Sequence, residues 1–358
     1  MNDYHETFLQ AIRETPEDDT PRLVYADWLD EHDQPERAEF IRAQIQLMRL
    51  SPHSRRRAVL LRRTRELFAA HGEIWRQELP KWARRRCVFQ RGFVAHVACT
   101  ALQFIQHGES LRRGAPVQSV RIYRGEGRIV VLAESPHLAG LTTLDLRSNL
   151  AGDVGAEALA TSRHLQHLRT LRLAYNNIGA AGMRAMAASP YLSNLTRLDL
   201  YGNFLHGNLV LAELSAAPWL AHLTALDLGQ LSWGIEAFRA LLTSPYLPRP
   251  LMLSLNSNGF DEEGAELLAA SPLLEQVVAL DLAGNSINQR GTQALAASPY
   301  LTRVRKLALS WNNIGDAGAH ALLASPHLGQ LRQLNVRHCN IKTARNALRQ
   351  RFGSRVYL

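Results

Sequence analysis

The sequence is poor in cysteine and contains no long hydrophobic run. Its three cysteines, Cys87, Cys99 and Cys339, are scattered over 358 residues, a distribution that fits neither a disulfide framework nor the paired spacing of a zinc site. No stretch approaches the roughly 18 uninterrupted apolar residues that a membrane-spanning helix needs. The polar start MNDYHETFLQ does not resemble a secretory signal. We therefore expect a cytoplasmic protein without disulfides or a membrane span.

Motifs of catalysis are missing as well. The chain has no glycine-rich phosphate loop, no HExxH, no CxxC and no GxSxG. Cys87 follows Arg84-Arg85-Arg86, and nearby cations can lower a thiol pKa and make the sulfur nucleophilic. The spacing identifies no base or orienting group for it. We predict a protein that is not an enzyme and uses no cofactor or metal, and keep a cysteine enzyme as the least favoured alternative.

What the sequence does contain is a repeat. A Ser-Pro pair, or a variant of it, recurs every 27 residues with one interval of 28. A fixed period of this length indicates a solenoid, in which each unit buries its apolar face against its neighbours. The serines of the intact pairs are Ser135, Ser189, Ser244, Ser271, Ser298 and Ser325.

Each repeat reads as a strand, a loop and a short helix. In 168–192, leucines at Leu168, Leu171 and Leu173 alternate with polar residues, as in a strand with one buried face. The following GMRAMAAS has helical composition. Pro190 should end that helix, because a residue before proline is disfavoured in the α region.

An asparagine follows the strand in most repeats. A buried amide at this position can bond the donors and acceptors of the turning backbone, so we expect these residues to be buried. They are Asn149, Asn176, Asn203, Asn258, Asn285 and Asn312. Two repeats depart from the pattern, with Leu231 and Cys339 at the asparagine position, and we expect 203–233 to bend irregularly.

The pattern LxxLxLxxNxI…G…AL…SPxL resembles leucine-rich repeats of the ribonuclease-inhibitor-like class. The resemblance covers about 117–349, with eight clear repeats and one degenerate repeat. It implies an α/β horseshoe solenoid with parallel strands on the concave face and helices on the convex face.

The first third is different. Residues 11–44 resemble the repeat-companion domain of bacterial proteins, most clearly at PRLVYADWL (21–29) and RAEFIR (37–42). That family implies an architecture but no activity. The predicted organisation is a small all-α companion domain at 1–50, a basic helical linker and N-terminal cap at 51–116, the repeat domain at 117–349 and a C-terminal cap tail at 350–358.

Charge is divided sharply along the chain. Residues 1–48 hold 4 basic and 12 acidic side chains, and residues 49–91 hold 13 and 3. Arginines interleaved with aromatic residues in 49–91 could bind nucleic acid, an acidic protein or a lipid surface. The arginines could instead form the outer face of an amphipathic helix and pair with the acidic neighbour. We predict that 1–48 packs on 49–91 through Leu47, Leu50, Leu60 and Phe68, and keep a nucleic-acid adaptor as the alternative function.

The candidate site lies on the strands. Residues that alternate with the leucines should face the concave side and bind a protein partner, whose identity the sequence leaves open, as it does the oligomeric state. The proposed set is Asp145, Arg147, Arg172, Tyr175, Asp199, Tyr201, Asp227, Asp281, Trp311 and Arg337. Asp199 and Asp227 should be like-charged neighbours, which favours a partner's Arg or Lys between them, with solvated carboxylates as the alternative.

Overall fold

The structure, a computed structural model, describes residues 2–203, 210–232, 234–248 and 250–358. The chain forms two compact units, Met1–Asp145 and Leu146–Leu358. Residues 204–209, the start of the stretch predicted to bend irregularly, lie outside the described residues.

The first unit begins with four helices, α1 (Asn2–Glu14), α2 (Thr20–Asp30), α3 (Pro35–Arg49) and α4 (Arg55–Trp75). Proline in the first turn starts both α2 and α3, where its missing N–H costs nothing. Helices α1 to α3 share one apolar core, which includes Leu9, Ile12, Tyr25, Leu29 and Ile41.

The first unit continues with strands where the sequence predicted a helical linker. Strands β1 (Cys87–Gln90) and β2 (Phe93–Thr100) form an antiparallel hairpin. Helix α5 (Ala101–Gly114), β3 (Ser119–Tyr123), α6 (Ile129–Ala133) and β4 (Thr143–Asp145) follow, and β2, β3 and β4 pair in parallel. The helical prediction for 51–116 is therefore wrong between 87 and 100, because the alternation in CVFQRGFVAHVACT belongs to strands and not to a linker.

The acidic helices do pack on the basic segment. Phe40 of α3 contacts Trp75 of α4 at a ring-centroid distance of 4.7 Å and Phe68 at 5.8 Å. Arg63 of α4 donates two hydrogen bonds to Glu39, at 2.7 and 2.6 Å. The predicted packing is confirmed, but of the four apolar residues named for it only Phe68 joins this aromatic cluster.

The second unit is built from eight parallel strands among the described residues, hydrogen-bonded in chain order. They are β5 (Thr170–Arg172), β6 (Arg197–Asp199), β7 (Ala225–Asp227), β8 (Leu251–Ser254), β9 (Val277–Asp281), β10 (Lys306–Ala308), β11 (Gln333–Asn335) and β12 (Val356–Tyr357). The last strand comes from the predicted cap tail, which therefore extends the sheet.

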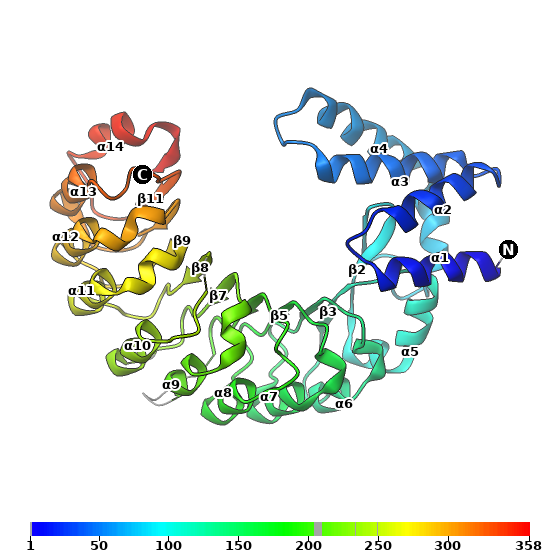
Figure 1. Cartoon of the computed structure of the whole chain (residues 1–358), viewed down its shortest axis with the longest axis horizontal. Coiled ribbons are helices and arrows are strands. Elements are labelled where there is room, and N and C mark those ends of the chain that lie inside the picture. Colours follow the sequence, from blue (N-terminus) through cyan, green and yellow to red (C-terminus); the bar gives the residue numbers. More distant parts are fainter. Residues whose placement is uncertain (1, 204–209, 233, 249) are drawn as a thin grey trace. The chain divides into compact units, whose positions relative to one another are not determined.

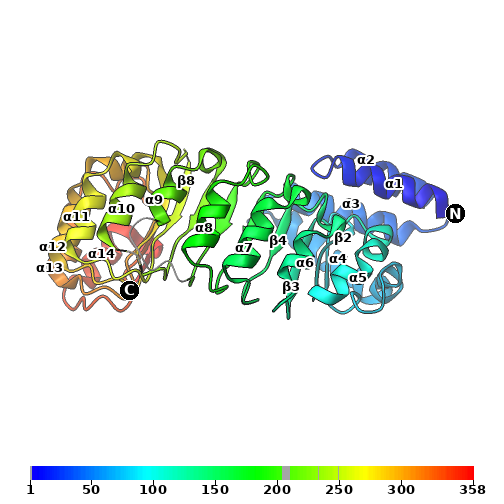
Figure 2. The ribbon, with the colours of Figure 1, turned by 90° about the horizontal axis from the view of Figure 1, so that it is seen from below.

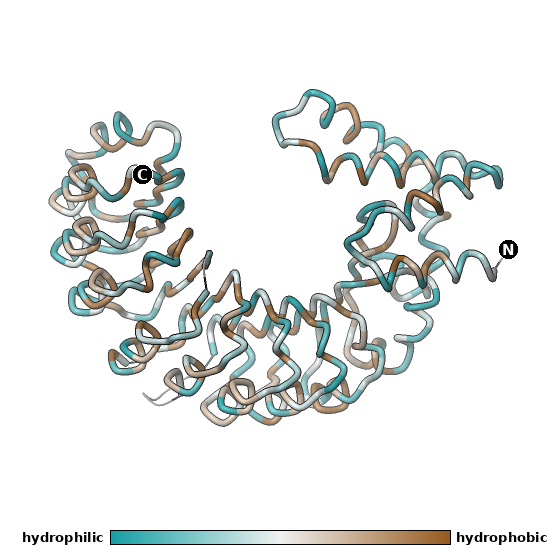
Figure 3. The backbone as a smooth tube through the Cα atoms, viewed as in Figure 1, coloured by the Kyte–Doolittle hydropathy of each residue, from teal (hydrophilic) through white to brown (hydrophobic). Residues whose placement is uncertain are grey.

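Helices cover the outer side of these strands (Figure 1). They are α7 (Gly152–Thr161), α8 (Ala180–Ala187), α9 (Val210–Ser215), α10 (Ile235–Leu242), α11 (Glu262–Ala270), α12 (Gln289–Ala297), α13 (Gly315–Ala324) and α14 (Arg345–Phe352). They follow one another in a row (Figure 2), and hydrophobic segments recur in each coil (Figure 3). The predicted division of strands and helices between two faces is confirmed for this unit.

The six asparagines are all buried, as predicted. The amide of Asn176 donates to Leu146 O and Leu173 O at 2.9 Å, and its Oδ1 accepts from the backbone N–H of Asn149 and Ala151. Where the asparagine is replaced by Cys339, the thiol takes over one bond, to Leu309 O at 3.0 Å. The side chain of Leu231, at the same position of another repeat, cannot make such bonds, so the ladder ties neighbouring loops where an asparagine is present.

In most Ser-Pro pairs, the serine also links neighbouring repeats. Ser189 Oγ donates to Ala160 O in the previous helix at 2.5 Å, and Ser298 Oγ donates to Ala269 O at 2.6 Å. Each hydroxyl satisfies a carbonyl that the end of a helix leaves unpaired. Pro190 and its equivalents end the helices, and the preceding serines join them.

Candidate functional site

The strand ends of the second unit form a row of mostly polar side chains. Parallel pairing aligns Arg172 with Asp199 and Asp199 with Asp227, as the sequence predicted. Ser254, Asp281, Ala308 and Asn335 continue the row. A hollow of about 530 Å³ lies along this face, lined by these residues and by those that begin each strand.

Each aspartate of the row turns the chain at its own strand end. Asp199 Oδ1 accepts from Tyr201 N at 3.1 Å, Asp227 Oδ1 from Gly229 N at 3.0 Å and Asp281 Oδ1 from Ala283 N at 2.9 Å. One carboxylate oxygen is thus occupied by a structural bond.

The negative charge of these three carboxylates is unfavourable at the half-buried positions that they occupy. Burial raises the pKa of Asp199, Asp227 and Asp281, and the charge of Asp227 raises that of Asp199 further. Arg147 and Arg172 oppose this rise at Asp199. A cation placed beside Asp227 would relieve the repulsion that the chain itself leaves there.

Tyr175 and Tyr201 lie next to this acidic pair. Their rings meet edge to face at 5.2 Å, and Tyr175 Oη donates to Gln230 Oε1 at 3.4 Å. A Cβ on Gly202 or Gly229 would come within 2.6 Å of the ring of Tyr175 or Tyr201. Because these two positions have no side chain, the rings of Tyr175 and Tyr201 fit there. The two rings form a tyrosine ledge at the edge of the strand face.

Trp311 and Arg337 belong to a separate cluster, five repeats beyond Tyr175. The indole of Trp311 is 65% exposed and stacks on His338 at 3.9 Å, and the guanidinium of Arg337 lies 5.3 Å from the ring centre of Tyr357. The structure thus divides the predicted aromatic anchors into two groups. His338 and Tyr357 were missed because the residue at the position of His338 varies from repeat to repeat and Tyr357 follows the last repeat.

Asp145 ends the first unit, and Arg147 is the second residue of the next. Asp145 is buried, with Arg121 Nε 4.0 Å from its Oδ2. Because its side chain is almost fully buried, Asp145 is a weaker candidate for partner binding than Asp199 or Asp227.

The basic segment 49–91 uses several of its arginines internally. Arg57 donates to Leu50 O, Arg84 to Leu79 O, and Arg86 lies 4.7 Å from the ring centre of Tyr123. These contacts weaken the case for phosphate binding there.

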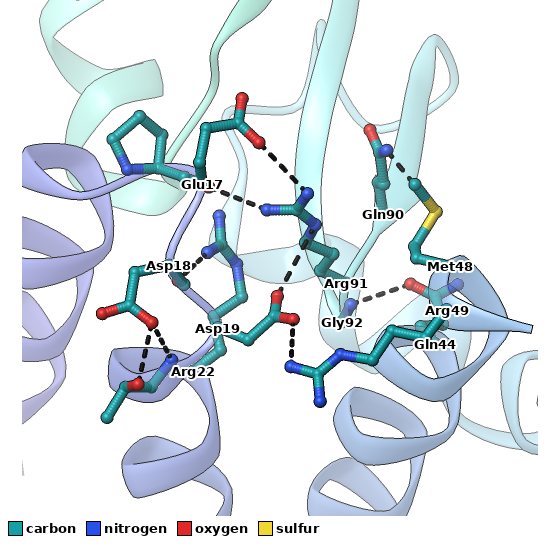
Figure 4. Close-up of polar contacts among 12 residues, drawn as sticks. Glu17, Asp18, Asp19, Arg22, Gln44, Met48, Arg49, Gln90, Arg91 and Gly92 are labelled. Carbon is teal, nitrogen blue, oxygen red and sulfur yellow. Dashed lines mark hydrogen bonds and ion pairs between the residues drawn. The ribbon is translucent and has the colours of Figure 1, made fainter.

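Arg91, the last residue of this segment, joins the hairpin turn to the loop before α2 (Figure 4). It donates to Pro16 O at 3.0 Å and to Glu17 at 3.2 Å. Gly92 N donates to Gln44 Oε1 at 2.8 Å, which joins the same turn to α3. The arginine is therefore part of the packing of the first unit.

Cys87 shows no sign of activation. Its sulfur donates to Arg84 O at 3.3 Å, and burial raises the pKa of the thiol, an effect that Arg76 only partly offsets. The thiol is thus protonated at neutral pH, contrary to what a nucleophile requires. No described group of three or more His, Cys, Asp or Glu could hold a metal ion.

No described helix has the length and apolar character needed to cross a bilayer. Residues 139–160, 164–187 and 300–323 match the family model described as Leucine Rich repeat. The comparison with curated proteins found no match.

Among solved structures, the chain is similar to an internalin (inlF) from Listeria monocytogenes. The identity is 15% and the TM-score 0.39, over 65% of this chain and 64% of that one. The chain thus spans less than two thirds of that protein's length.

The family matches fall on the 27-residue units whose parallel strands, buried asparagines and outer helices are described above. The repeated part of this chain is therefore made of leucine-rich repeats.

Proposed function

We propose that the second unit is a non-enzymatic scaffold that binds a protein partner on its strand face. Tyr175 and Tyr201 would anchor the partner, and Asp199 and Asp227 would contact a basic group on it. The observation that carries the proposal is the pair of half-buried carboxylates on adjacent strands beside an exposed tyrosine ledge.

The energetics favour this end of the face. Two neighbouring carboxylates with raised pKa values repel each other, so an arginine or lysine between them gains more than it would on open surface. Tyrosine is among the residues that most often dominate binding energy, because a large ring is buried with little loss of conformational freedom. Tyr175 is 48% exposed and has no core to fill.

Another repeat of the chain shows that asparagine can replace aspartate at this strand position. Asn335 occupies the same strand position as Asp227, and its Oδ1 accepts the same bond, from Arg337 N at 3.3 Å. The double change Asp199→Asn, Asp227→Asn should therefore keep the fold while removing both charges.

The experiment is affinity capture with the full chain, followed by titration of each captured protein. The double asparagine variant and Tyr201→Ala should both weaken binding, the latter by about 1–3 kcal/mol. Glu266→Gln, on the exposed side of α11, is the control and should leave binding unchanged. A partner whose affinity is the same for both test variants would show that this face is not the binding site.

A further inference from the structure

The end of the chain holds a charge that the rest does not. Residues 299–358 contain ten basic side chains and one acidic, so their net charge is 10 − 1 = +9, equal to the +9 of the whole chain. The ten are Arg303, Arg305, Lys306, Arg332, Arg337, Lys342, Arg345, Arg349, Arg351 and Arg355. All other residues together are neutral.

The single carboxylate of this end, Asp316, is already occupied. It accepts backbone N–H bonds from Lys342, Thr343 and Ala344 at 3.0, 2.9 and 3.0 Å. These bonds lower its pKa to about 2, so it is ionised and committed to holding the loop before α14.

Most of the ten cationic side chains, unlike Asp316, are not occupied by hydrogen bonds or ion pairs that the structure describes. Arg345, Arg351 and Arg355 donate to backbone carbonyls. The other seven are exposed, and none forms an ion pair within the part of the chain that the structure describes. Lys306 and Arg337 lie on or just after strands β10 and β11, and Lys342 follows in the next loop.

Aromatic rings occur in the same repeats as these cations. One face of the Trp311 indole stacks on His338, and the previous repeat has Gly284 at the same position, which offers no side chain to the other face. Trp311 has a left-handed backbone, with φ +60°, as do the residues at the same position of the other repeats, among them Tyr175, Gly202 and Gly284. This φ belongs to the turn of the repeat, so a glycine can replace Trp311 without a change of backbone conformation.

A hollow of about 400 Å³ adjoins the indole. Its lining residues are Asn285, Ser286, Asn288, Trp311, Asn312, Asn313, His338 and Asn340. The amide of Asn340 donates to Asn313 Oδ1 at 3.3 Å, which leaves Asn313 Nδ2 and Asn340 Oδ1 free to donate and to accept.

We propose that this surface binds single-stranded nucleic acid. A base would stack on Trp311 beside the amides of Asn313 and Asn340, and Lys306, Arg337 and Lys342 would contact phosphates. An exposed aromatic face among unpaired cations is the combination that single strands require, since stacking needs an unpaired base and the backbone needs positive charge. An acidic protein would match the cations, but its charge does not require an exposed indole beside two amides. The site goes beyond the protein-binding proposal and uses different residues.

The test is fluorescence anisotropy of labelled single-stranded RNA and DNA of about ten nucleotides, with the full chain, over a range of salt concentrations. Trp311→Gly is the informative variant, because glycine already occupies this backbone position in Gly202 and Gly284. We expect it to weaken binding by about five- to a hundred-fold and to leave the salt dependence unchanged. The double change Lys306→Ala, Arg337→Ala should flatten the slope of log K against log salt by about 0.7 for each phosphate that the protein no longer neutralises.

Tyr175→Gly, at the same repeat position, is the matched control. It should leave nucleic-acid binding unchanged and weaken only the protein partner, so the two proposals can fail independently. Comparison of the RNA with the DNA probe shows which of the two nucleic acids the site prefers. The proposal would be overturned if Trp311→Gly bound the single strands with wild-type affinity. It would also be overturned if the protein bound duplex DNA or heparin as tightly as the single strands, because attraction between opposite charges would then explain the binding.

Discussion

The two units stabilise buried polar groups in opposite ways. In the second unit, short uncharged side chains bond to the adjacent repeat, and the same bonds recur in repeat after repeat. In the first unit, a few arginines make unique contacts with distant parts of the chain. Arg37 is buried against Trp75, Phe89 and Phe93, at 4.8, 5.3 and 5.6 Å from the ring centres.

The charge of Arg37 is only loosely paired. Glu78 lies 3.7 Å away, and one terminal nitrogen of the guanidinium has no hydrogen-bond partner. Burial accordingly lowers the pKa of Arg37. The second unit is thus stabilised by many equivalent local bonds, and the first unit by a few contacts that each occur once.

The asparagine ladder gives the largest expected effect. Asn176→Ala removes the partners of two backbone N–H groups and of several carbonyls in a fully buried turn. We expect a loss of about 3–5 kcal/mol, since each unsatisfied buried group costs about 1–3 kcal/mol. Denaturant unfolding followed by hydrogen exchange would measure the loss and assign it to the second unit. Asn194→Ala, which removes one exposed bond to Gln166 O, should cost less than about 1 kcal/mol.

Gly92 tests the unique contacts of the first unit. Its φ is +86°, and a Cβ there would lie 2.3 Å from Ile41 Cγ1 and 2.7 Å from Ile41 Cα. Gly92→Ala should cost about 2–4 kcal/mol, because backbone strain adds to a clash that the main chain of α3 cannot avoid. Gly127→Ala has a similar φ, +67°, but open space, and isolates the backbone contribution. Equal losses for the two variants would mean that the close approach of hairpin and helix contributes nothing.

Two serines compare the units directly. Ser189 and Ser135 are both 6% exposed, yet Ser189 bonds to Ala160 O and Ser135 Oγ has no partner. We expect Ser189→Ala to lower the free energy of unfolding by about 1–2 kcal/mol, and Ser135→Ala to leave it unchanged or raise it slightly. Thermal unfolding of both variants would show the difference. Similar losses would place the role of the serine in the Ser-Pro turn and not in the bond between helices.

The acidic row gives the smallest effect and a definite pH dependence. The pKa of Asp227 is raised on folding, so the native state binds more protons, and its contribution to stability falls as pH rises through the folded pKa. Asp227→Asn should therefore raise stability at neutral pH by at most about 1 kcal/mol, and the gain should vanish below the unfolded pKa near 4. For Asp316 the sign is opposite, because its pKa is lowered to about 2 and its stabilisation is lost as pH falls from 3.8 towards that value. Unfolding curves from pH 2 to 8 would test both, and a destabilised Asp227→Asn at neutral pH would contradict the expected sign.

The repeat could be predicted in detail from the sequence. Each bond of Asn176 or Ser189 reaches a residue 30 or fewer positions away, and a period in the sequence reports such contacts directly. The hairpin at Arg91 and Gly92 could not be predicted in this way. Its contacts reach back 75 residues to Pro16 and 48 residues to Gln44, and no repeated pattern marks them.

The sequence by itself determined the strand, loop and helix of each repeat, the burial of the asparagines and the row of aspartates. Those features depend on neighbours at a constant separation. Only the tertiary structure decided which side chains share a surface. Tyr175 joined Tyr201 over two glycines, Trp311 stacked on His338 at the other end, and Arg37 came to lie among three aromatic rings. The physical reason is that side-chain contacts depend on how the rings lean across strands and how distant segments dock, and a one-dimensional pattern contains neither.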